Sequence, residues 1–311
     1  MRPLRAVGAC LAAMLGAVAL AGCGLGPGPA PSAVQLLVTR DFGARVLHRS
    51  GALKVSGQET VMSLLMRNYT VTTRFGGGFV QSIDGLSGGQ QAGQPVDWFY
   101  YDNGVQAIKG AAATDVHPGD HIWWDHHDWS QTEEVPAVVG SFPEPFLNGI
   151  GGKRLPVRVE CADVAGYACR TVTSRLRSFG VPAAIAALGS SGEPQTLRVI
   201  VGPWATIGGD LSAQGIERGP RDSGVYARMS PDGRTLTPLD ENGRALAPLF
   251  AGTGLIAATR RAEDAPAWVV SGTDSRGVEL AARDFNEATL QDRFAVALLP
   301  GGARPLPEVG G

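Results

Sequence analysis

The feature that most constrains the fold is a break in the pattern of apolar residues at 130–155. This segment contains three prolines and the run Asn-Gly-Ile-Gly-Gly at 148–152, which are residues typical of turns and linkers. The chain has 311 residues, a length that suggests two domains. We therefore predict a first domain at 33–135 and a second at 155–311, joined by a segment at 136–154 that packs on both.

The first predicted domain combines one helix with several short strands. Val61, Leu64 and Leu65 share one helical face, and Thr60 or an earlier polar residue can cap the helix that they define. Short apolar or alternating runs bounded by turn residues predict strands. The predicted strands lie at 34–39, 47–55, 71–73, 79–83, 96–101, 105–108 and 121–125. One helix packed on several strands predicts an α+β fold.

The run at 96–101 is a strongly aromatic strand. Trp98 and Tyr100 should point to one face and Phe99 and Tyr101 to the other, because successive side chains of a strand alternate. If one face forms the core, the other exposes two aromatic side chains and is a candidate contact surface. The alternative is that both faces are covered, one by the helix and one by the second domain.

Four segments of the first domain occur in an informative order. They are the helix at 60–65, Phe-Val-Gln-Ser-Ile-Asp-Gly-Leu at 79–86, Trp-Phe-Tyr-Tyr-Asp-Asn-Gly at 98–104, and Gly-Asp-His-Ile-Trp-Trp at 119–124. Through them the sequence resembles the transcobalamin-like C-terminal domain family over about 35–130. The resemblance implies a β-grasp-like fold, related to the small domain that closes over cobalamin in vitamin-carrier proteins. It also implies export and a role in vitamin uptake.

Aromatic side chains in this region are candidates for binding a flat ligand, since aromatic faces stack on such molecules. The predicted ligand-binding residues are Trp98, Tyr100, Asn103 and Trp124.

The stretch Asp-His-Ile-Trp-Trp-Asp-His-His-Asp-Trp at 120–129 raises the question of a metal site. In an extended strand, His121, Asp125 and His127 share a face, and histidine with carboxylate can bind a divalent metal. No fixed metal-ligand spacing accompanies them, and such side chains at a strand exit are usually solvated or hydrogen-bonded. We therefore predict no metal ligand.

The second predicted domain alternates strands with helices. The predicted strands lie at 154–160, 197–202, 224–227, 254–259, 267–272 and 294–298, and the predicted helices at 168–179 and 275–286. This alternation predicts an α/β sheet. The expected architecture is therefore α+β, a β-grasp-like domain followed by an α/β sheet domain.

The second domain carries no recognisable catalytic set. The sequence has no GxSxG, no Walker loop and no GxGxxG after a strand, and residues 155–311 contain no histidine, which excludes a Ser-His-Asp triad within them. We predict no catalytic residue, no cofactor and no enzymatic activity.

The N-terminus has the composition of an export signal. Arg2 and Arg5 precede an apolar run at 6–20, and the run ends in Leu-Ala-Gly-Cys at 20–23, which resembles the bacterial lipobox. We predict a signal peptide at 1–22, lipidation of Cys23, and a Gly/Pro-rich tether at 23–32. The chain is then held by its lipid on the extracytoplasmic face of the bacterial cell membrane.

The remaining cysteines and the charge limit the other partners. If Cys10 leaves with the signal peptide and Cys23 carries lipid, Cys161 and Cys169 remain and are most simply a disulfide in an exported protein. The net charge is −2 and no run of Lys or Arg occurs, which disfavours nucleic acid as a partner.

Two hypotheses for function follow. In the first, the chain is a non-catalytic lipoprotein that binds a small molecule, a corrinoid or another vitamin, as an accessory to an importer. In the second, it is a cell-envelope protein-interaction module without a small-molecule ligand.

Overall fold

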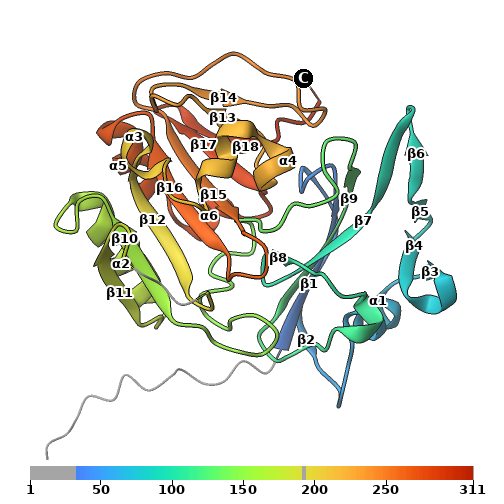
Figure 1. The fold of residues 1–311 in the computed structure, drawn as a ribbon. Coiled ribbons are helices and arrows are strands. Elements are labelled where there is room, and N and C mark those ends of the chain that lie inside the picture. Colours follow the sequence, from blue (N-terminus) through green and yellow to red (C-terminus); the bar gives the residue numbers. More distant parts are fainter. Residues whose placement is uncertain (1–32, 191–193, 311) are drawn as a thin grey trace, which may run out of the picture.

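The computed structural model describes residues 33–190 and 194–310 and shows a mixed α and β fold built on two main sheets (Figure 1). The predicted signal peptide at 1–22, the predicted lipidation of Cys23 and the predicted tether at 23–32 lie outside the described residues. The predicted α+β class is confirmed.

The first sheet has the strand order β2-β1-β9-β7-β6, with β8 paired to β7. Its strands are β1 (Ala33–Arg40), β2 (Arg45–Lys54), β6 (Gly89–Gln91), β7 (Gln94–Asp102), β8 (Val105–Gln106) and β9 (His121–Asp128). Strand β9 lies parallel to β1 and antiparallel to β7, so the two aromatic strands are neighbours in the middle of the sheet. A small separate sheet contains β3 (Val71–Arg74), β4 (Phe79–Ile83) and β5 (Leu86–Ser87).

Helix α1 (Val61–Asn68) forms where the sequence predicts it. Thr60 is its N-cap, accepting a hydrogen bond from Ser63 N while the Ser63 hydroxyl accepts one from Thr60 N, which completes a capping box. Its buried face, which includes Leu64 and Leu65, packs in one core cluster with β1, β7 and β9. The short 3-10 helices η1 (Phe75–Gly77) and η2 (Ala111–Ala113) complete this half of the molecule.

The second sheet has the order β11-β10-β12-β16-β15-β17-β18. Its strands are β10 (Val157–Cys161), β11 (Ala183–Ala187), β12 (Leu197–Pro203), β15 (Gly254–Thr259), β16 (Ala267–Gly272), β17 (Ala295–Leu299) and β18 (Gly302–Leu306). The first four strands of that order are parallel, and the last three pair antiparallel. The sequence patterns predicted the central strands and missed the two edges, β11 and β18.

Both faces of the second sheet are covered. Helices α2 (Tyr167–Ser178) and α5 (Ser275–Arg283) share one core cluster with the sheet. The opposite face carries a second cluster with the irregular chain between β12 and β15. That chain contains α3 (Trp204–Ile207), η3 (Gln214–Arg218), α4 (Pro220–Ser223), β13 (Ala227–Met229) and β14 (Leu236–Pro238), and α6 (Glu287–Leu290) follows α5. The strand predicted at 224–227 overlaps the observed strand β13 only at Ala227.

The segment at 136–154 is packed rather than extended. Phe142 and Phe146 are buried in the core of the second sheet, with ring contacts to Trp268 at 6.0 and 5.0 Å. Val138 belongs instead to the cluster between the two sheets. The chain between the two sheets thus contributes to both cores.

A shared cluster joins the two sheets. Phe294, directly before β17, packs against the rings of Trp123 at 5.3 Å and Phe42 at 5.3 Å. At Gly43 a Cβ atom would lie 2.0 Å from Asp292 O, so a larger residue cannot stand where the backbones meet. The buried members of this cluster are Leu37, Phe42, Tyr101, Trp123, Val135, Val138, Tyr226, Leu239 and Phe294.

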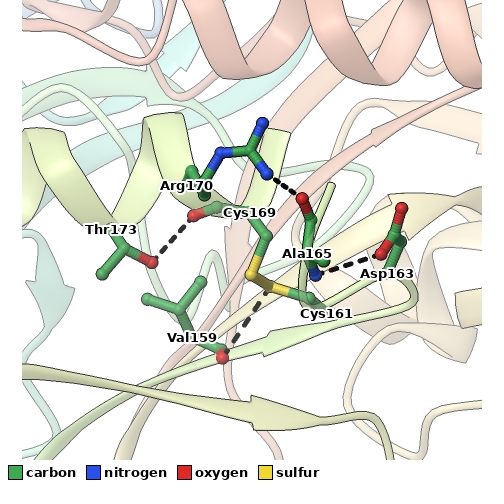
Figure 2. The surroundings of a disulfide bond; sticks show 7 residues. All are labelled: Val159, Cys161, Asp163, Ala165, Cys169, Arg170 and Thr173. Atoms are coloured by element: carbon green, nitrogen blue, oxygen red, sulfur yellow. Dashed lines mark hydrogen bonds between the residues drawn. A yellow bond between two sulfur atoms is a disulfide. The ribbon is translucent and has the colours of Figure 1, made fainter. Parts of the chain in front are cut away.

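The predicted disulfide is present. Cys161 at the end of β10 and Cys169 in the first turn of α2 are joined, with Cα atoms 5.9 Å apart (Figure 2). Figure 2 also shows Thr173 Oγ1 donating to Cys169 O at 2.8 Å and Ala165 N donating to Asp163 Oδ1 at 3.0 Å. The bond therefore ties the end of a strand to the start of the helix that packs on it. In the described part of the chain, no helix has the length and apolar character needed to cross a membrane.

Candidate functional site

The aromatic residues predicted to bind a ligand lie in the core. Trp98, Tyr100 and Trp124 are all buried in the cluster that contains α1. Trp98 Nε1 donates to Leu86 O at 3.0 Å, and the rings of Tyr100 and Trp124 stack at 4.8 Å. Their faces are therefore occupied by protein, and they present no open stacking surface.

The opposite face of the same strands is also covered. Tyr101 and Trp123 are buried against Phe294 of the second half of the chain, and the Phe99 ring stacks on His127 at 4.5 Å. The expectation that one face exposes two aromatics is therefore wrong. The alternative holds, because one face packs on α1 and the other on the second sheet.

Asn103 holds three segments together at the turn after β7. It is fully buried with φ 52°, and its Nδ2 donates to Asp120 Oδ1 at 2.9 Å and to Gly149 O at 2.9 Å. Its Oδ1 accepts a hydrogen bond from His121 N at 2.8 Å. All of these Asn103 bonds are to protein groups, so the side chain orders the turn rather than facing a cavity.

The His and Asp side chains of β9 are engaged in hydrogen bonds. Asp125 Oδ1 accepts from Phe42 N at 3.0 Å, and Asp125 Oδ2 accepts from Gly43 N at 2.9 Å. His127 Nδ1 lies 2.8 Å from Asp125 Oδ1, with both side chains buried. Within residues 33–190 and 194–310, no group of His, Cys, Asp or Glu is arranged to hold a metal ion.

A pocket of about 370 Å³ lies on the second sheet beside α5, but a different pocket is the better candidate because it adjoins the predicted residues. This second pocket, which we call the hairpin pocket, has a volume of about 350 Å³. The Tyr100 hydroxyl lies 2.8 Å from Thr114 Oγ1 and donates to Lys109 O at 2.6 Å, and both partners line the pocket. Its lining residues are Asp102, Val105, Gln106, Ala107, Ile108, Lys109, Ala113, Thr114, Asp115, His117, Ile150, Gly151 and Arg260.

The lining combines apolar and polar side chains from three parts of the chain. Ile108 is 67% exposed on the rim, whereas Asp102 is buried. Asp102 Oδ1 and Arg260 Nε have no hydrogen-bond partner among the described residues, whereas His117 Nδ1 lies 3.4 Å from Asp120 Oδ2. Buried polar groups in folded proteins are nearly always paired, so Asp102 Oδ1 and Arg260 Nε are available to a polar group that enters the pocket.

The electrostatics of the wall follow from crowded carboxyl groups. Burial, together with the nearby carboxylate of Asp120, raises the pKa of Asp102 from 3.8 to about 8, although Gly151 N donates a hydrogen bond to it. Burial also raises the pKa of Glu144 from 4.5 to about 7, against the hydrogen bonds that Asn148 donates. The raised pKa favours the protonated form of Asp102, which can donate a hydrogen bond.

A third pocket, of about 440 Å³, lies between the two sheets. Its wall contains His121, whose Nδ1 lies 2.7 Å from Ser141 Oγ, and the ion pair of Arg49 with Asp292 crosses from one half of the molecule to the other. Burial and the charge of Arg49 lower the pKa of His121 from 6.5 to about 4, so this imidazole is neutral. The buried His–Ser pair is part of the contact between the two sheets.

Sequence reasoning missed the residues of the hairpin pocket for a simple reason. Asp102 stands in the Asp-Asn-Gly turn, where a carboxylate is usually solvated, and nothing in the sequence indicates that Ile150 and Gly151 lie beside it. Arg260 comes from the end of β15, far away in sequence. The available signal was the turn motif itself, since the family resemblance includes Asp102-Asn103-Gly104.

Comparison with known families adds one finding. Residues 58–128 match the model of the family described as domain of unknown function (DUF4430), a transcobalamin-like domain. The matched region holds α1, both aromatic strands and most of the residues that line the hairpin pocket. No curated protein matches the chain.

Proposed function

We propose that the chain is a non-catalytic lipoprotein, anchored through Cys23 outside a bacterial cell membrane, that binds a small molecule as an accessory to uptake. The lipobox-like run at 20–23 supports the anchor. The transcobalamin-like match at 58–128 supports a role in vitamin handling. The finer resemblance, to the C-terminal domain of cobalamin carriers, belongs to this proposal.

The observation that carries the binding proposal is Asp102 in the hairpin pocket. A buried carboxyl group with an unpaired oxygen stands beside an apolar rim that includes Ile108. Ligand sites typically combine an apolar lining with a few placed polar groups, in volumes of roughly 300–1,000 Å³. At about 350 Å³ the pocket fits a single small heterocycle better than a whole corrinoid, which would reach only its mouth.

The ligand's chemistry follows from the wall. Protonated Asp102 donates a hydrogen bond, and the Arg260 guanidinium is a further donor, so the ligand should present acceptors such as carbonyl oxygens or ring nitrogens. Its apolar part would contact Ile108 and Ile150.

The test is a calorimetric titration of the chain from Gly24 onward with cobalamin, cobinamide, biotin and thiamine. Ile108→Asp should abolish the binding of any ligand that the wild type takes up, because it places a charge on the apolar rim. Leu211→Asp is the matched control, since Leu211 is 59% exposed, close to the 67% of Ile108, and lies outside the pocket.

The pocket would be refuted if both variants weakened ligand binding equally, or if neither variant weakened it. If none of the four probes binds, the cell-envelope interaction module becomes the better hypothesis. The anchor is tested separately, by metabolic labelling with palmitate in the wild type and in Cys23→Ser.

A further inference from the structure

The most exposed aromatic side chain among the described residues is Phe75, on the turn between β3 and β4. Its exposed fraction is 87%, and that of Phe79 on the other side of the turn is 36%. The two rings lie 6.3 Å apart, edge to face. We call Phe75–Phe79 the aromatic tip. In Figure 1 its small sheet stands on the outer side of the first sheet, away from the second.

The backbone of the tip is unfavourable for the residues it carries. Phe75 has φ 53°, a left-handed conformation that bulky residues rarely adopt, and Gly76 and Gly77 follow at 70° and 95°. A Cβ added at either glycine would meet nothing within 4 Å, so crowding does not require glycine there. Because Phe75 is exposed, no internal packing offsets this strain. Unfavourable backbone that the fold does not use is a reason to look for function.

A chain of contacts connects Ala33, the first residue of β1, with the segment that leads to the tip. Ala33 at the start of β1 pairs with Lys54, and Lys54 O accepts a hydrogen bond from Arg67 Nη2 at 2.9 Å. Arg67 is in the last turn of α1, two residues separate that helix from β3, and β3 leads to Phe75 over a strand length of roughly 13 Å. Fully extended, residues 24–32 reach at most roughly 30 Å. A lipid on Cys23 would therefore hold Ala33 within roughly 30 Å of the bilayer, a distance that allows the tip to reach the same surface.

From these observations we propose that the aromatic tip docks on the lipid bilayer beside the N-terminal anchor, inserting Phe75 and Phe79 at the interface. The proposal rests on the lipid anchor proposed above. Two adjacent phenyl rings bury well at the boundary of headgroups and acyl chains. Docking would hold the first sheet in one orientation to the membrane and leave the hairpin pocket fixed relative to a membrane partner.

The first experiment measures co-sedimentation of the unlipidated chain, from Gly24 onward, with vesicles of phosphatidylcholine and phosphatidylglycerol. Phe75→Ser with Phe79→Ser should weaken binding by at least roughly tenfold, since burying a Phe side chain is worth that factor or more. Phe250→Ser is the matched control, because Phe250 is 61% exposed but lies on the second half of the chain. Equal loss in the control overturns the proposal.

A second measurement covers the case in which unanchored binding is weak. An N-terminal His tag on Gly24 tethers the chain to nickel-chelating vesicles, which imitates the lipid whether or not Cys23 is modified. With Phe75→Cys carrying an environment-sensitive fluorophore, tethering should shift the emission to the blue. The same label on Phe250→Cys should not respond. The proposal is overturned if the emission at position 75 does not shift. It is also overturned if the double variant of Phe75 and Phe79 binds vesicles as well as the wild type does.

Discussion

The two faces of the β7–β9 pair are covered in different ways. The face with Trp98 and Trp124 packs on α1 and the strands around it in a mainly apolar cluster, in which buried His126 contacts the Trp98 ring. The face with Tyr101 and Trp123 packs on the second sheet. There, aromatic rings alternate with buried polar groups, of which Asp125 and His127 are the central pair.

The difference shows how the halves of the molecule depend on each other. The apolar face is closed by a helix from the same sequence region, as an independent small domain would be. The polar face is closed by Phe294, and Asp125 fixes the turn at Phe42 that packs on it. Contacts between domains are commonly more polar than a domain core, and this one follows that rule. The first sheet is therefore complete only with the second sheet in place.

Trp98→Ala tests the apolar face and has the largest expected effect. Removing this buried indole should lower the free energy of unfolding by about 3–5 kcal/mol, through lost burial and the cavity left behind. The measurement is chemical denaturation followed by circular dichroism. Phe75→Ala is the control, since an exposed ring should cost under about 0.5 kcal/mol. If the two variants lost similar amounts of unfolding free energy, the burial of Trp98 would be contradicted.

Asp125→Ala tests the polar face. The substitution leaves the N–H groups of Phe42 and Gly43 without their acceptor, so we expect a loss of about 3 kcal/mol. Hydrogen exchange should show faster opening at 42–43 than in α1. Asp128→Ala, on the same strand but only partly buried, should lose far less. A loss under about 1 kcal/mol for Asp125→Ala would show that the network does not hold the faces together.

The disulfide acts within the second sheet alone and gives a smaller effect. Cys161→Ala with Cys169→Ala should lower stability by about 2 kcal/mol, as expected for closing a short loop. Reduction of the wild type should produce the same shift in denaturation midpoint. Free thiol from either cysteine in the unfolded, unreduced chain would contradict the bridge.

The Asp102 carboxyl group behind the hairpin pocket gives a destabilising effect that depends on pH and is absent below about pH 4. Asp102 has a folded pKa of about 8, above its ordinary 3.8, so its contribution is fully present below pH 4 and is lost as pH rises through 8. Thermal melts should therefore show wild-type stability falling over that range. Asp102→Asn should reduce the fall and exceed the wild type above pH 8. If Asp102→Asn left the slope of stability against pH unchanged, a group other than Asp102 would cause the fall. The control is Asp115→Asn, which changes an exposed carboxylate of the same pocket.

Local pattern was sufficient for several elements. Helix α1 with an N-cap at Thr60, the central strands of the second sheet and the pairing of Cys161 with Cys169 were readable because each depends on neighbouring residues or on simple counting. The strand edges β11 and β18 were not, since their residues carry no strong alternation. The ring pair of Phe75 and Phe79 was also missed, because exposure of a side chain next to a glycine run is a property of the folded surface.

The sequence by itself determined which stretches become strands and helices, the α+β class, and the alternation that sends Trp98 and Tyr101 to opposite faces. Only the tertiary structure decided that both faces are buried. It also decided that Asp102 is buried beside Ile150 and Gly151 and that Arg260 comes to the same pocket. The physical reason is that side-chain direction follows from local backbone geometry, whereas burial depends on which distant segment arrives to cover each face.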